Sequence, residues 1–246
     1  MTEPAAVPPY QPLPEDWERA LIIVAHPDDI EYGSAAAVAR WTGQGKTVTY
    51  TLVTSGEAGI DGIPPEESGP LREQEELASA AIVGVDKVEF LGHPDGVIEH
   101  SIELRRDLTH AIRRAQPQIV ITSNYEDFWG GIIPNQPDHI AVGRTVIEAV
   151  QAAGNRWIFP EDGLEPWGGV DAVWVAGASD GQHAVDVSDT FATGMESLRA
   201  HAAYLRGLGD AAAGTEEFLE RFAREAGARL GTSHAVAFKV VQLRFG

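Results

Sequence analysis

The chain contains no cysteine in its 246 residues. Disulfide bonds, thiolate metal ligands and cysteine nucleophiles are therefore excluded, and any metal site has to be built from histidine, aspartate or glutamate. A chain without disulfides is compatible with the cytoplasm, which is where we expect the protein.

Basic residues are also scarce: 18 Lys and Arg stand against 37 Asp and Glu, a formal net charge of −19. Nucleic acids and anionic membrane surfaces would be repelled, so neither is expected as a partner. No apolar run approaches the about 18 residues of a membrane-spanning helix. Residues 1–16 are rich in proline and hold no basic residue, which predicts an extended arm rather than a secretory signal.

Strand and helix patterns alternate from residue 17 onward. The predicted strands are residues 21–25, 47–54, 87–91, 118–123, 170–176, 184–187 and 235–245. The predicted helices are residues 30–44, 70–83, 103–115, 139–153, 189–205 and 215–226, with Pro70, Asp138 and Ser188 at three of their starts. This alternation predicts one α/β domain over residues 17–246, with a Rossmann-like, mostly parallel sheet and helices on both faces. No glycine-rich Gly-x-Gly-x-x-Gly loop follows the first strand, which argues against a nucleotide site.

A histidine and two aspartates follow the first predicted strand directly, in the run His26-Pro27-Asp28-Asp29. Ligands of open α/β sheets bind at this carboxyl edge. His and Asp are zinc ligands, and a second acid beside them can act as a general base. The alternative is a turn in which an aspartate caps the next helix. Two adjacent carboxylates favour the functional interpretation, because their repulsion has to be offset by a cation or by hydrogen bonds.

His139 also follows a strand and a loop and opens a helix, so it can reach the same edge of the sheet. His26, Asp29 and His139 would form a site of three ligands with a fourth position open, which is typical of catalytic zinc. Taken alone, His139 could equally be an exposed histidine at a helix start, and the second His-Pro-Asp copy at His93 shows how weak one such motif is.

Ala25-His26-Pro27-Asp28-Asp29 and the later Pro137-Asp138-His139 resemble the paired signatures of the LmbE-like, or PIG-L, de-N-acetylase family. The resemblance extends over roughly residues 21–205. Further matching pieces are Thr54-Ser55-Gly56-Glu57-Ala58-Gly59, Arg72-x-x-Glu75, the segment 90–96, and Val185-Asp186-Val187-Ser188 leading into a helix with His201. Members are zinc-dependent amidases that remove acyl groups from amino sugars and their conjugates.

The resemblance implies a role for each matching position. His26, Asp29 and His139 would bind Zn²⁺ or another divalent metal, and Asp28 would be the general base for a zinc-activated water. Asp138 would orient a metal ligand, although as the helix N-cap it needs no such role.

One position departs from the family pattern. Many relatives have a histidine where this chain has Gln136, and that histidine is credited with stabilising the transition state. Gln136 can donate a hydrogen bond to the oxyanion but carries no charge. His183 is a candidate to replace the missing family histidine; the alternative is that His183 is a histidine of a surface loop. The expected activity is removal of an acetyl group from a small N-acetylated amino sugar or glycoside. The alternative is a non-catalytic or weakly active metal- or ligand-binding member of the fold.

Substrate contacts are predicted at Glu57, Arg72 and Asp95, which match pocket positions of relatives. Arg72 could bind a carboxylate or phosphate, or pair with Glu75 or Glu76 on its own helix. The long loop 124–137 carries aromatic residues that would form a lid or pack down on the body. The expected partner is a small N-acyl substrate, and a homo-oligomer is left open.

Overall fold

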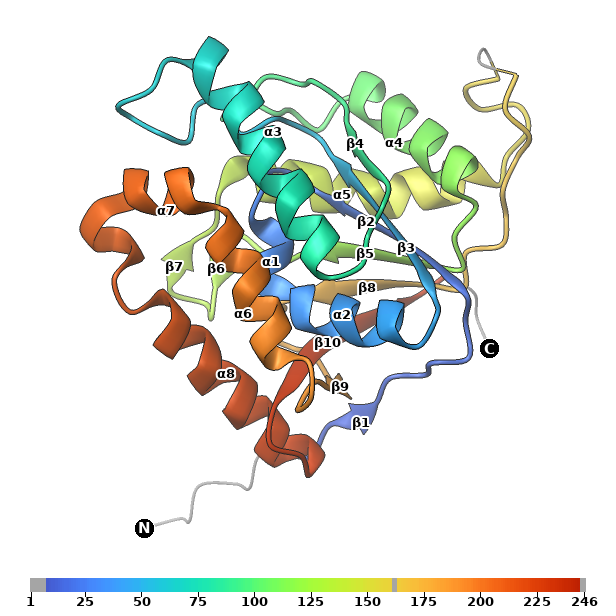
Figure 1. The fold of residues 1–246 in the computed structure, drawn as a ribbon. Coiled ribbons are helices and arrows are strands. Elements are labelled where there is room, and N and C mark those ends of the chain that lie inside the picture. Colours follow the sequence, from blue (N-terminus) through green and yellow to red (C-terminus); the bar gives the residue numbers. More distant parts are fainter. Residues whose placement is uncertain (1–7, 161–162, 244–246) are drawn as a thin grey trace.

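The computed structural model describes residues 8–160 and 163–243. An eight-stranded sheet runs through this part of the chain, and helices cover both of its faces (Figure 1). The strand order is β1-β9-β10-β8-β5-β2-β3-β4. The strands are β1 Gln11–Pro12, β2 Arg19–Val24, β3 Thr47–Leu52, β4 Val88–Phe90, β5 Ile119–Ser123, β8 Ala172–Ala176, β9 His183–Asp186 and β10 Ala235–Gln242. A separate hairpin pairs β6 Phe128–Trp129 with β7 Ile133–Pro134.

The sheet is parallel except along β10, which runs antiparallel to both β8 and β9. β2 lies between β3 and β5 and is parallel to both. Five of its six residues are buried, as expected for a strand covered on both faces. The predicted fold class, a mostly parallel α/β sheet with helices on both faces, is confirmed.

Two cores fill the two sides of the sheet. The first packs α1 Asp29–Gly33 and α2 Ala35–Gly43 around Trp41 and Trp174, and also includes Ala80 of α3 Pro65–Ile82. The second packs α4 Ile102–Ala115 and α5 Pro137–Ala153 on the opposite face, around Leu108 and Val146. The remaining helices are α6 Phe191–Ala200, α7 Ala202–Leu208, the 3₁₀ turn η1 Gly209–Ala212 and α8 Thr215–Leu230, and Figure 1 shows α6 beside α2. Within the described ranges, no helix is long and apolar enough to cross a membrane.

Two predicted helices are each two helices in the structure. The predicted helix 30–44 breaks at Ser34, which ends α1 and precedes α2. The predicted helix 189–205 breaks at His201, between α6 and α7. Gly33 and Ser34 at the first break are weak helix formers, whereas the second break lies among residues that favour helix, so local propensity did not reveal it.

The predicted helix starts were wrong at three positions. α3 begins at Pro65, and Pro70 lies inside it, where its missing N–H removes one backbone hydrogen bond. Gln136, not Asp138, is the N-cap of α5, because Pro137 already opens that helix and the Asp138 carboxylate is engaged elsewhere. Ser188 donates its hydroxyl to Asp186, and Thr190 precedes α6 instead.

The described part of the N-terminal arm lies against the domain. β1 pairs with β9, and Leu13 and Trp17 are buried. The Glu15 carboxylate accepts hydrogen bonds from Arg40 and Trp41 of α2. Residues 1–7, the first part of the predicted arm, lie outside the described residues.

Candidate metal centre and active site

The site forms where β2 and β5 end at the same edge of the sheet. The turn after β2 carries His26 and Asp28, and α1 begins directly after it with Asp29. The long connection after β5 leads into α5, whose first turn carries His139. Because β2 and β5 are neighbouring parallel strands, residues more than a hundred positions apart meet at their carboxyl ends.

The polar side-chain atoms of His26, Asp29 and His139 lie close to one another. His139 Nε2 lies 2.9 Å from Asp29 Oδ1 and 3.3 Å from His26 Nδ1, and His26 Nδ1 lies 3.7 Å from Asp29 Oδ2. Donor atoms bound to one tetrahedral metal ion at about 2.0–2.2 Å are about 3.3–3.6 Å apart. Two imidazole nitrogens and a carboxylate at these separations fit one divalent metal ion.

Two carboxylates orient the His26 ring. Its Nε2 lies 3.1 Å from Asp95 Oδ1 and 3.3 Å from Asp138 Oδ2. The Asp138 carboxylate is itself fixed, since it accepts the backbone N–H groups of Gly96 and Ile98 at 2.8 and 3.1 Å. With Nε2 directed at these acids, Nδ1 is the nitrogen that faces His139, so Asp138 orients the ring of His26.

Charge and burial set the protonation of this cluster. Burial alone would lower the pKa of His26, but hydrogen bonds with Asp138 and Asp95, and a third carboxylate, raise it to about 10. Burial would raise the pKa of Asp29, yet the charge and hydrogen bond of His139 hold it well below its usual range. In the metal-free cluster the surrounding carboxylates thus favour the charged form of His26, a positive charge that a bound metal ion would replace.

Asp28 lies beside this cluster and is only 6% exposed. Its backbone has φ 101°, in the left-handed region that is strained for a residue with a side chain. Burial raises the pKa of its carboxyl to about 6, although the Arg72 guanidinium opposes that shift. Arg72 Nη2 donates to Asp28 Oδ2 at 3.2 Å.

Arg72 is itself buried, 2% exposed, and its donors are directed at the protein. Besides Asp28 it donates to the carbonyls of Pro27 and Gly56, and it stacks 4.1 Å above the Tyr204 ring. A Cβ added at Gly56 would lie 2.2 Å from its guanidinium, so glycine is needed there. Arg72 therefore positions Asp28; contact with a substrate stays a prediction.

Glu57 and Asp95 connect two loops beside the cluster. Glu57 Oε1 accepts the backbone N–H of Asp95 at 2.9 Å, and Asp95 Oδ2 accepts the N–H of Ala58 at 2.8 Å. Asp95 thus lies against the site through His26. A role of either carboxylate in substrate binding stays a prediction.

Gln136 and His183 lie in different parts of the molecule. Gln136 is exposed at the start of α5, three residues before His139. His183 is the half-buried first residue of β9, and β10, β8 and β5 separate that strand from β2. With neighbouring strands about 4.8 Å apart, His183 is roughly 19 Å from β2, so it is neither a surface loop histidine nor a substitute for a histidine at position 136.

Two residues that support the site, Asn135 and Glu76, were not identified from the sequence. Asn135 Oδ1 lies 3.0 Å from His139 Nδ1, although Asn135 belongs to neither of the paired motifs. Glu76 Oε2 accepts the backbone N–H of Asp28, although Glu76 lies in an acid-rich helix segment that is typical of a solvated face. The spacing of Asn135 and His139, four residues apart across a helix start, is the one signal the sequence offered.

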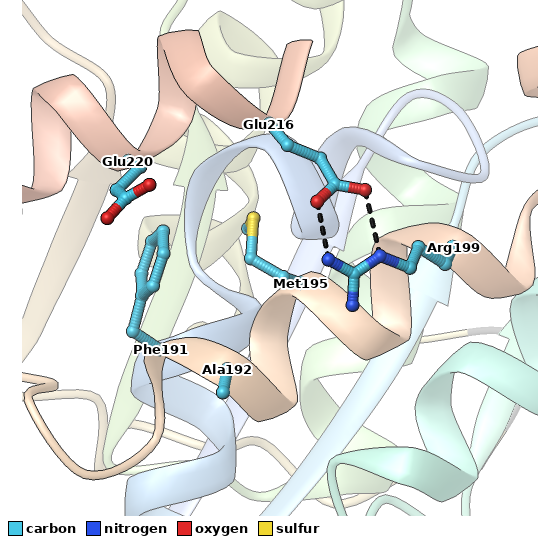
Figure 2. A pocket seen from close by; sticks show the side chains of 6 residues that line it. All are labelled: Phe191, Ala192, Met195, Arg199, Glu216 and Glu220. Atoms are coloured by element: carbon cyan, nitrogen blue, oxygen red, sulfur yellow. Dashed lines mark hydrogen bonds and ion pairs between the residues drawn. The ribbon is translucent and has the colours of Figure 1, made fainter.

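A separate shallow cleft lies between α6 and α8 (Figure 2). It is lined by Phe191, Ala192, Met195, Arg199, Glu216 and Glu220. The Arg199 guanidinium is paired with the Glu216 carboxylate across it. None of these side chains belongs to the cluster around His26.

The fold and the cluster together define a class of α/β protein with a histidine and carboxylate site at the edge of a mostly parallel sheet. The family description "PIG-L: GlcNAc-PI de-N-acetylase" matches residues 21–150. The chain belongs to the PIG-L de-N-acetylase family, as its paired motifs predicted.

Relatives within this family act on N-acetylated sugars. The chain is 32% identical over 193 residues to a diacetylchitobiose deacetylase of Thermococcus kodakarensis, covering 76% of this chain and 70% of the relative. It is 29% identical over 184 residues to a 1D-myo-inositol 2-acetamido-2-deoxy-alpha-D-glucopyranoside deacetylase of Streptomyces avermitilis, covering 63% of this chain and 60% of that protein.

Solved structures agree on the architecture. The N,N'-diacetylchitobiose deacetylase of Pyrococcus horikoshii, solved with an inhibitor, superimposes with a TM-score of 0.82 at 25% identity, covering 93% of this chain and 85% of that chain. GalB, the 4-carboxy-2-hydroxymuconate hydratase of Pseudomonas putida, shares the fold with a TM-score of 0.75 at 19% identity, covering 93% and 98%. The fold thus also carries a different reaction, so function has to be argued from the site.

Proposed function

We propose that the protein is a metal-dependent hydrolase that removes an acetyl group from the amide nitrogen of a small N-acetylated amino sugar or glycoside. The observation that carries this proposal is the convergence of His26, Asp29 and His139 beside the buried carboxyl of Asp28. The two sugar deacetylases to which the chain is similar support the same substrate class. They lend no support to a non-catalytic binding protein.

The metal ligands would be His26 Nδ1, His139 Nε2 and the Asp29 carboxylate, the three groups whose polar atoms converge. A divalent ion such as Zn²⁺, when bound there, would lower the pKa of a water molecule to about 7 and polarise the amide carbonyl. Asp138 and Asp95 would keep the His26 ring oriented, and the carboxylate of Asp29 is anchored by the backbone N–H of Ala25 and His26.

Asp28 would be the general base. It accepts the proton of the attacking water as the new C–O bond forms at the amide carbon, and it passes that proton to the nitrogen as the C–N bond breaks. Acetate and a free amine result. Arg72 keeps the carboxylate directed, because its guanidinium donates a hydrogen bond to Asp28 Oδ2.

Substrate binding would involve Glu57 and Asp95, which lie on the two connected loops beside His26. Carboxylates accept hydrogen bonds from sugar hydroxyls without requiring a charged substrate. The guanidinium of Arg72 is directed at protein groups, which favours a neutral sugar over a phosphorylated one.

The test is release of free amine from a panel of N-acetylated amino sugars that includes N,N'-diacetylchitobiose. Wild type loaded with Zn²⁺ is compared with Asp28→Asn and with a control, Asp171→Asn, which alters an exposed aspartate before β8. We expect amine from wild type and the control, and a loss of about 10²- to 10⁴-fold in Asp28→Asn with its metal content retained. Metal-loaded wild type that releases no amine from any member, or an Asp28→Asn variant with full turnover, would contradict the proposal.

A further inference from the structure

A second polar cluster lies buried next to Asp28. It consists of Glu31 on α1, Glu76 on α3 and His201 at the junction of α6 and α7. The side chains of all three are 0% exposed. None of the three is a proposed metal ligand. Burying three ionisable side chains is unfavourable, so their presence here requires another explanation.

The cluster combines an ion pair with a third acid. His201 Nε2 lies 3.4 Å from Glu31 Oε2 and 3.7 Å from Glu76 Oε2. The other oxygen of Glu31 is held by the hydroxyls of Ser79 and Ser197, at 2.5 and 3.2 Å. Glu31 is therefore fixed by two hydroxyls and faces the imidazole, and the imidazole in turn faces Glu76.

Glu76 connects this cluster to Asp28. Its Oε2 accepts the backbone N–H of Asp28 at 3.3 Å. On the other side of the same turn, Arg72 donates to the carbonyl of Pro27 and to the Asp28 carboxylate. The backbone of Asp28 needs such support, because a φ of 101° is strained for a residue with a Cβ.

We infer that Glu76 is a positioning residue for the reaction: it holds the Asp28 peptide in its left-handed conformation, and the Glu31–His201 pair holds Glu76. This inference rests on the proposed role of Asp28 as the general base. Without the acceptor at Glu76, the turn relaxes and the Asp28 carboxyl moves away from the position where it can take a proton. A shift of this kind lowers turnover more than it weakens substrate binding.

Glu76 has a conservative partner for a test. Burial and the neighbouring charge of Glu31 raise the pKa of its carboxyl well above the usual range, which favours the neutral form. Glutamine keeps the size, the neutrality and an acceptor oxygen, whereas leucine keeps the approximate volume and loses the acceptor. Glu76→Gln and Glu76→Leu therefore separate the hydrogen bond from packing.

The first experiment measures the hydrogen bond directly, by amide hydrogen exchange resolved at Asp28. We expect exchange about tenfold faster in Glu76→Leu than in wild type, the equivalent of about 1.4 kcal/mol, and near wild type in Glu76→Gln. The amide of Ile121 in β5 serves as a control for global loosening. Equal exchange at Asp28 in all three proteins would overturn the inference.

A second variant covers the case in which Glu76→Leu does not fold. His201→Gln removes the group that faces Glu76 from the other side and leaves the acceptor in place. We expect faster exchange at Asp28 here too, by a smaller factor, and an unchanged amide counts against the role of the Glu31–His201 pair.

The second experiment is a double-mutant cycle on amine release. Glu76→Leu should lower kcat about 10- to 100-fold with KM little changed, and Glu76→Gln should retain most of kcat. In an Asp28→Asn background, Glu76→Leu should have no further effect, because it acts through Asp28. A further loss of the same size there would show a general structural role and overturn the inference. If Asp28→Asn alone turns over normally, the proposed function fails while the exchange result stands.

A measurement of metal content tests the competing explanation, that Glu31, Glu76 and His201 bind a metal ion. Two acids and a histidine can also hold a cation, in which case Glu76 would be a ligand. We expect His26→Ala/His139→Ala protein, exposed to Zn²⁺ and washed, to retain none. Retention of about one equivalent that His201→Gln abolishes would overturn the positioning role.

Discussion

Asn135 accepts a hydrogen bond from the ring of His139, with 3.0 Å between Oδ1 and Nδ1. The same Oδ1 accepts from Trp129 Nε1 at 2.7 Å, and the Asn135 amide donates to the carbonyls of Asn124 and Glu126. Since Oδ1 can only accept, the proton of His139 lies on Nδ1 and its Nε2 is left for Asp29 and a metal. A loop residue thus fixes the tautomer of a candidate ligand.

Replacing Asn135 should weaken metal binding. In Asn135→Ala the His139 ring loses its acceptor and its orientation, and we expect Zn²⁺ affinity to fall about 10- to 100-fold. A competition titration with a fluorescent chelator measures this. Asn155→Ala, at an exposed asparagine before Trp157, is the matched control and should bind Zn²⁺ like wild type. Unchanged affinity in Asn135→Ala would show that the ring is held without it.

Gln136→His should raise turnover of an N-acetylated sugar, by about tenfold. A protonated histidine at the start of α5 donates a charge-assisted hydrogen bond to the developing oxyanion, roughly twice as strong as a neutral one. The measurement is kcat for amine release, with Gln182→His on the β8–β9 loop as the control. A fall in kcat would mean that the site is built around glutamine.

Glu15→Gln should reduce stability in a pH-dependent way. Burial alone would raise the pKa of Glu15, but hydrogen bonds and the charge of Arg40 lower it overall. A lowered pKa stabilises the fold above the ordinary value near 4.5 and ceases to do so as the pH falls through the folded value. The loss should be below about 1 kcal/mol, because the pair is partly screened.

Thermal unfolding of wild type and Glu15→Gln at several pH values checks this. The difference in Tm should be largest near pH 7 and shrink as the solution becomes acidic. A difference that is independent of pH would assign the effect to packing of the arm rather than to the Glu15–Arg40 ion pair.

Chelation should abolish amine release without unfolding the protein, because the two large cores on either side of the sheet are packed from apolar side chains that need no metal. Restoring Zn²⁺ should restore activity and raise Tm, since a ligand at 1,000 times its Kd stabilises the folded state by about 4 kcal/mol. In His26→Ala/His139→Ala the Tm should no longer respond to Zn²⁺. A response that persists there would place the stabilising ion elsewhere.

The sequence predicted the residues that follow a buried strand better than those that meet through helix packing. The apolar run before His26 identifies a central parallel strand. Because residues at the carboxyl ends of neighbouring parallel strands share one edge of the sheet, His26, Asp29 and His139 come together there. The order of motifs along the chain was sufficient for the family.

Glu76 and His201 could not be found in the same way. Glu76 stands among four other charged or amide residues in Arg72-Glu73-Gln74-Glu75-Glu76, a pattern typical of an exposed helix face. It is buried because α3, α1 and the α6–α7 junction meet there, and the break that places His201 falls within a segment of high helix propensity. Contacts between helices distant in sequence decide both positions. The sequence offered only the family pattern for His201 and no direct signal for the burial of Glu76.

The left-handed backbone of Asp28 implies that thermal stability and activity place different demands on this position. Glycine adopts a φ of 101° without penalty, so Asp28→Gly should relieve the backbone strain, but it removes the proposed base and the carboxylate that pairs with the buried Arg72 guanidinium. In such a variant the relief of backbone strain and the loss of the Asp28–Arg72 ion pair would act on thermal stability in opposite directions. Substitutions intended to raise the thermal stability of this protein should therefore avoid the turn at Asp28 and be placed in other parts of the chain.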